Sequence, residues 1–197
     1  MLKIIGTNHL MKEEEIIRLI DAENPEIIGI ELCKIREYIY LNKINTEVKE
    51  DNSLLGKISN AIKKKAKEQN VEYGCDMYSA LTYSINNKIP YVLIDKDIQE
   101  IQQLFQKIPQ NEQQGFMNEI VEFEKQTIIP TSINEDDFLS NLKKNYPISF
   151  EILINLREYH IALSILKIIT NNPEKRVIII LGKGHIKGVN KLLGYEF

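Results

Sequence analysis

One stretch near the end of the sequence, VIIILGKGH at residues 177–185, joins an apolar, mostly β-branched run to a glycine-rich exit that ends in histidine. A run that is apolar on both faces is typical of a strand buried in a parallel sheet. The same construction stands near the start, where Leu2–Ile5 is followed by Gly6-Thr7-Asn8-His9. Side chains just beyond the carboxyl ends of parallel strands converge in one crevice. We therefore expect His9 and His185 to meet in one site.

Two further runs, Ile27–Leu32 and Tyr91–Ile94, have the same apolar character, so the pattern predicts four strands. The intervening stretches show helical periodicity. They cover Lys12–Ala22, Leu54–Gln69, Met77–Asn86, Ile98–Lys107, Gln113–Ile128, Phe138–Asn145 and Phe150–Ile169, and a further helix over Lys187–Leu193 follows His185. This order predicts an α/β fold with a central, mostly parallel sheet flanked by helices.

The length of 197 residues suits a single domain with a sizeable core. The stretch from about residue 105 to 155 contains no strand-like run and is rich in Gln, Asn and Glu. We interpret it as a helical insert that serves as a cap or as a dimerisation element, which makes a homodimer possible.

The composition narrows the classes of partner and compartment. The formal net charge of −3 argues against a protein that binds nucleic acid through phosphate contacts. The two cysteines, Cys33 and Cys75, stand in apolar surroundings without metal-ligand spacing, so we expect buried thiols in a reducing compartment, by default the cytoplasm. No run reaches the roughly 18 apolar residues of a membrane span, and the start of the chain does not resemble a signal peptide.

The two histidines are the first candidates for chemistry. A neutral imidazole at a strand exit can ligate a transition metal. We expect Gly6, Gly182 and Gly184 to lie in loops, where glycine lets the backbone turn sharply and approach a ligand. A single histidine after a strand is more often a hydrogen-bonded loop residue than a ligand, and it is the repeated construction that favours a shared site.

Glu31 interrupts a buried strand, where a carboxylate needs a partner, a proton or a metal. It is therefore either a metal ligand or general base, or the partner of Arg36 or Arg157 in an ion pair. Each arginine could clamp a carboxylate or stabilise an oxyanion, or could simply be a solvated surface charge. His160 stands three residues after Arg157 on the same helix face and is interpreted as a surface residue.

Two aspartates complete the candidates. Asp76 opens a predicted helix, where it either complements the helix dipole or reaches the crevice as an oxygen ligand or base. Asp95 stands at the exit of the third predicted strand and is the better site candidate. It would be an oxygen ligand itself, or it would bind and orient the histidines. Asp97 is placed to cap the helix that follows.

Six short elements stand in order along nearly the whole chain: Gly6–His9, Ile30–Cys33 with Arg36, Gly74–Met77, Leu93–Ile98, Leu156–Glu158 with Ile161-Ala162, and Leu181–His185. Together they resemble the motifs of the TraB/PrgY family, which is related to the TIKI metalloproteases and more distantly to the erythromycin-esterase and ChaN-like fold. The chain departs from those motifs at three positions: Asp76 replaces a glutamate, Cys33 an aspartate and Leu156 a glutamate.

The resemblance implies a single TraB-like domain over residues 1–197 and an active site built from two Gly-x-x-His motifs, a glutamate and an arginine. On that pattern His9, His185 and Glu31 would bind a divalent metal (Mn, Co or Zn), with Asp76 as a further ligand. Arg157, supported by Arg36, would stabilise developing charge.

We therefore expect a metal-dependent, peptidase-like hydrolase that acts on a peptide or a small molecule. The alternative is a non-catalytic module that sequesters a peptide, a pheromone-like signal or haem.

Overall fold

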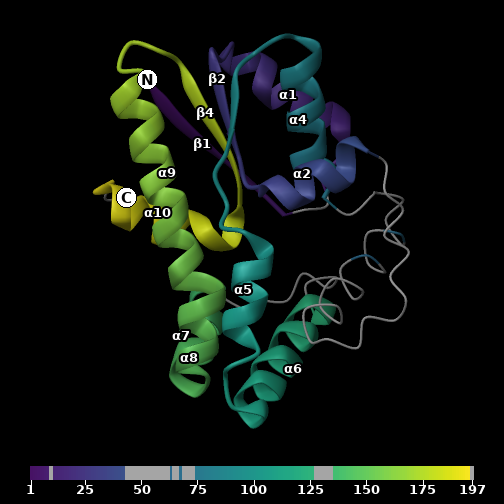
Figure 1. The fold of residues 1–197 in the computed structure, drawn as a ribbon, viewed down its shortest axis with the longest axis vertical. Coiled ribbons are helices and arrows are strands. Elements are labelled where there is room, and N and C mark those ends of the chain that lie inside the picture. The colour runs from purple at the N-terminus through teal and green to yellow at the C-terminus, as the bar shows by residue number, and fades with distance from the viewer. Residues whose placement is uncertain (9–10, 43–62, 64–66, 68–73, 127–134, 196–197) are drawn as a thin grey trace.

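The computed structural model describes residues 1–8, 11–42, 63, 67, 74–126 and 135–195 (Figure 1). Its centre is a four-stranded sheet with the strand order β1-β4-β2-β3, in which every pair of neighbours is parallel. The strands are β1 (Leu2–Thr7), β2 (Ile27–Ile30), β3 (Tyr91–Leu93) and β4 (Val177–Gly182). The α/β fold with a parallel sheet is thus confirmed, and each predicted strand is found.

Helices connect and cover the strands. They are α1 (Glu13–Glu23), α2 (Lys34–Leu41), α4 (Cys75–Asn86), α5 (Ile98–Phe105), α6 (Gln110–Gln126), α7 (Glu135–Asn145), α8 (Pro147–Phe150), the π-helix η1 (Glu151–Asn155), α9 (Leu156–Asn171) and α10 (Lys183–Leu193). The predicted helix Leu54–Gln69 falls almost entirely outside the described residues. Asp97 caps α5 as predicted, because its side chain accepts a hydrogen bond from the Gln99 N–H at 2.8 Å.

The glycines of the two repeated motifs do not lie in loops. Gly6 is inside β1, paired with Leu181 of β4, and a Cβ at this position would overlap the side chain of Ile186 on α10. Gly182 is the last residue of β4, and Gly184 is already in α10, which begins four residues earlier than predicted. β4 passes directly into α10 without a loop, whereas β1 ends at Thr7 and α1 begins at Glu13.

The alternation of side chains along β4 builds a core on each face of the sheet. Ile178 and Ile180 pack with residues of α1 and α4, whereas Ile179 and Leu181 pack with residues of α9 and α10. All six residues of β4 are buried, as expected for a strand with a neighbour on each side and helices on both faces.

The segment after β3 forms a helical part beyond the carboxyl ends of the strands (Figure 1). Helices α5, α6, α7 and α8 share a separate hydrophobic cluster. The continuous run from α8 through η1 into α9 leads from this part back along the sheet. Within the described residues, no helix is both long and apolar enough to span a membrane.

The close packing around Gly29 gives a first prediction. Gly29 of β2 pairs with Ile179 of β4, and a Cβ at position 29 would overlap the buried Ile179 side chain. Overpacking of this kind costs about 1–3 kcal/mol. We expect Gly29→Val to lower the free energy of unfolding by that amount in urea titrations followed by circular dichroism. Val92→Thr, at an exposed position of β3, is the control and should change it by no more than about 0.5 kcal/mol. An unchanged midpoint for Gly29→Val would contradict the tight packing.

Candidate functional site

A cluster of charged side chains lies at the carboxyl edge of the sheet. Glu31 directly follows β2, and Asp95 stands two residues after β3. Arg36 extends from the first turn of α2 and Arg157 from the first turn of α9. Glu31 is 2% exposed and Asp95 7% exposed, so both carboxylates are removed from water. The topology thus brings together four of the residues singled out from the sequence.

Glu31 is held by contacts on both carboxylate oxygens. Its Oε1 accepts a hydrogen bond from Arg157 Nη2 at 2.5 Å, and its Oε2 accepts one from the Gly182 N–H at 2.7 Å. Its own N–H donates to the Ile180 carbonyl at 3.1 Å and continues the sheet pairing. The ion pair between Glu31 and Arg157, one of the sequence alternatives, is therefore present.

Asp95 binds both arginines. Arg157 donates from Nε to Oδ1 and from Nη2 to Oδ2, each at 3.0 Å, in a bidentate arrangement. Arg36 Nη2 forms a hydrogen-bonded ion pair with Oδ2, and the Lys96 N–H donates to Oδ1 at 2.8 Å. Bidentate arginine–carboxylate pairs are strong and orientationally specific. Arg36 and Arg157 are consequently not free surface charges.

Electrostatics keeps the guanidinium groups charged. Burial alone would lower the pKa of Arg157, but the carboxylates of Asp95 and Glu31 more than compensate, so the pKa lies above its ordinary value. The same balance, with Asp95 as the main partner, raises the pKa of Arg36. The two arginines thus neutralise two buried carboxylates, which removes most of the desolvation cost that isolated charges would carry.

His185 lies beside this cluster, in the first turn of α10. Its ring is 7% exposed, with Nε2 3.8 Å from Glu31 Oε1 and Nδ1 3.4 Å from Glu158 Oε1. Each ring nitrogen of His185 thus faces the carboxylate of a different glutamate, which fixes the orientation of the ring between Glu158 and Glu31.

Glu158 was missed as a site residue in the sequence, where it was named only as the last residue of the Leu156–Glu158 element. Its carboxylate is buried against α10 at Gly188, where a Cβ would overlap both carboxylate oxygens. Gly184 and Gly188 stand one helical turn apart on α10. That spacing of small residues was the signal that another helix approaches closely.

His9, a further candidate, is outside the described residues. Asp76 is fully buried in the first turn of α4, where its Oδ1 accepts a hydrogen bond from the Met77 N–H at 2.9 Å. Cys33 is buried as expected, whereas Cys75 is only half-buried, and both are free thiols.

The described residues supply two donors of a metal centre and no third. His185 Nε2 and Glu31 Oε1 face each other, and the carboxylate at Nδ1 of His185 is the usual support of a ligating histidine. Within the described ranges, however, no group of three His, Cys, Asp or Glu side chains is arranged to hold an ion. These residues alone therefore do not fit a metal, and the expected site depends on His9.

The fold and the cluster define an α/β protein whose polar site lies at the carboxyl edge of a parallel sheet. No family model matches the sequence. The chain is similar to MJ1365, an uncharacterized protein of Methanocaldococcus jannaschii, with 24% identity over 210 residues that cover 96% of this chain and 52% of the relative. The chain thus spans about half the length of that relative, and the resemblance to the TraB/PrgY family stays a prediction.

The ion cluster predicts an asymmetry between its two arginines. Arg157→Met would leave two buried carboxylates without their shared partner, and breaking a buried pair in this way costs about 3–5 kcal/mol. Arg36→Met should cost less, because Arg36 pairs with Asp95 alone and is more exposed. Chemical unfolding of both variants measures the difference. The double variant Glu31→Gln plus Arg157→Met should regain part of the loss, and equal costs for the two single variants would contradict the arrangement.

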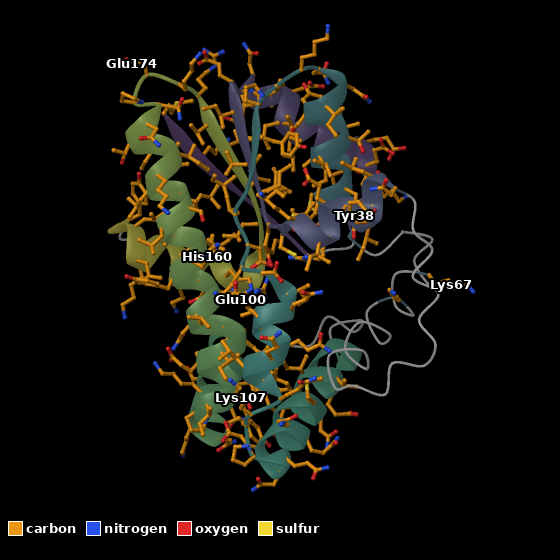
Figure 2. The ribbon with its side chains drawn as sticks, in the orientation of Figure 1. Tyr38, Lys67, Glu100, Lys107, His160 and Glu174 are labelled. Carbon is orange, nitrogen blue, oxygen red and sulfur yellow. The ribbon has the colours of Figure 1, made fainter. Side chains whose placement is uncertain are left out.

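His160 gives a prediction about pH. It is half-buried on α9, where it and Glu100 lie near the carboxyl edge of the sheet (Figure 2), and burial together with Lys96 lowers its pKa below the ordinary 6.5. Folding therefore favours the neutral ring, so this contribution to stability is present above pH 6.5 and is lost as the pH falls toward the lower folded-state pKa. Proton NMR titration, assigned with His160→Gln, should show the ring titrating below pH 6.5. A midpoint at or above that value would contradict the prediction.

Proposed function

We propose that this protein is a divalent-metal-dependent hydrolase of the peptidase type, with its site at the carboxyl edge of the sheet. The observation that carries the proposal is the placement of His185 between Glu158 and Glu31. A carboxylate at one ring nitrogen is the arrangement that orients metal-ligating histidines, and here the other nitrogen faces Glu31.

Each residue of the cluster has a distinct part in this proposal. Glu31 and His185 are the ligands within the described residues, and His9 is the third. When bound, the metal would polarise a carbonyl group and make a water molecule more acidic. Glu158 holds the proton on Nδ1 of His185, and Asp95 fixes the plane of the Arg157 guanidinium.

Arg157 has one nitrogen to offer a substrate. Its Nε and Nη2 donate to Asp95 and Glu31, whereas Nη1 has no partner among the described residues. A guanidinium that is already oriented can stabilise developing negative charge without reorganisation. The role of Arg157 toward an oxyanion is therefore assigned to Nη1.

The second candidate is a binding module that holds a peptide, a pheromone-like signal or haem without turnover. One observation favours it: all four carboxylate oxygens of Glu31 and Asp95 already accept hydrogen bonds from the protein itself. Glu31 could then serve to fix the architecture, and the surrounding surface would bind the ligand.

Metal content and peptide hydrolysis, measured on the same preparations, separate the two candidates. After incubation with Mn²⁺, Co²⁺ or Zn²⁺ and desalting, elemental mass spectrometry should find about one ion per wild-type chain. We expect little or none in His185→Ala and Glu31→Gln, and an affinity about 10–100-fold lower in Glu158→Gln. His160→Ala, a histidine outside the cluster, is the matched control and should retain the ion.

Hydrolysis of an internally quenched peptide library should stop with chelator and return with added metal. A wild-type protein that retains no metal, or a His185→Ala variant that retains as much, would contradict the hydrolase. Binding of library peptides without metal and without cleavage would identify the module instead.

A further inference from the structure

A cleft of about 800 Å³ lies beside the charged cluster, between α7, the run from α8 to α9, and α10. Its size is within the range of small-molecule sites, about 300–1,000 Å³. Its lining includes Leu139, Ser140 and Lys143 of α7, Ile154 of η1, and Lys187 and Lys191 of α10. One wall is the π-helix η1, a conformation that is rare and frequently found at functional sites.

The charges of the cleft are unbalanced toward the positive. Lys143 on α7 and Lys191 on α10 line the cleft from two different helices, and neither has an ion-pair partner within the part of the chain that the structure describes. Lys187 of α10 also lines the cleft, so three lysines stand against two carboxylates, Glu151 and Glu158, and the lining has one positive charge in excess. Glu158 faces His185, and Glu151 accepts a hydrogen bond from the uncharged amide of Asn155 at 2.6 Å. The excess positive charge is suited to an anion.

Part of the lining is apolar, because Leu139, Phe150, Ile154, Leu156 and Leu192 contribute hydrocarbon side chains to the wall. An occupant that uses both features has one anionic end and an apolar body.

We propose that this cleft binds an aliphatic carboxylate, with the carboxylate at Lys143 and Lys191 and the hydrocarbon chain against the apolar wall. Binding of the carboxylate in this cleft does not require that the neighbouring charged cluster hydrolyse a substrate.

Isothermal titration calorimetry with octanoate tests the proposal directly. Octanoate should bind in the millimolar range or tighter, whereas 1-octanol and octyltrimethylammonium, which share its chain and lack its charge, should bind at least tenfold more weakly. The variant Lys143→Met plus Lys191→Met should weaken octanoate at least tenfold. The matched control Lys107→Met plus Lys167→Met removes two exposed charges that do not line the cleft and should leave the affinity unchanged (Lys107, Figure 2).

Ser140→Phe provides a second, steric test, because it fills the cleft from an exposed position of α7. It should abolish octanoate binding while circular dichroism and thermal unfolding stay unchanged. Equal affinity for octanol, undiminished binding in the Lys143/Lys191 or Ser140 variants, or tighter binding of N-acetyl-Leu-Leu than of octanoate would overturn the assignment.

Discussion

The fold depends on how one carboxylate is buried. Glu31 leaves β2 toward the interior, and its two oxygens are bound by the Gly182 N–H at the end of β4 and by Arg157 at the start of α9. These bonds tie two neighbouring strands to the helix that covers them. Because an unpaired carboxylate at this depth would cost several kcal/mol, β2, β4 and α9 can assemble in this way only when the whole arrangement is complete.

The sheet was predictable because its signal is local. Four short runs that are apolar on both faces indicate buried parallel strands, and each was found with nearly the predicted bounds. The helix boundaries were harder to predict from the sequence. Gly182-Lys183-Gly184 indicates a loop from residue type alone, but β4 passes straight into α10. That helix packs closely against β1 at Gly6 and against α9 at Gly188, where a Cβ would overlap a side chain of the other element. Tertiary packing decided the outcome over local propensity.

The site was predictable to the extent that strand exits determine it. Glu31 and Asp95 are placed by the ends of β2 and β3. The apolar runs that precede them in the sequence indicate that both carboxylates are buried. The place of Glu158 in the site could not be predicted from the sequence, since the residue after Arg157 is expected to point away from it. Only the approach of α10 at Gly188 shows that Glu158 turns toward His185 rather than toward water. The π-helix likewise has no reliable signal in a single sequence.

Glu158 is also where the two sites proposed for this protein meet. Its carboxylate lines the cleft and at the same time faces Nδ1 of His185. An anion that displaces this carboxylate on entering the cleft would also change the contact between Glu158 and Nδ1 of His185. On the two proposals together, occupancy of the cleft and binding at the charged cluster would be coupled through this single side chain, and by thermodynamic linkage the coupling free energy is the same in both directions.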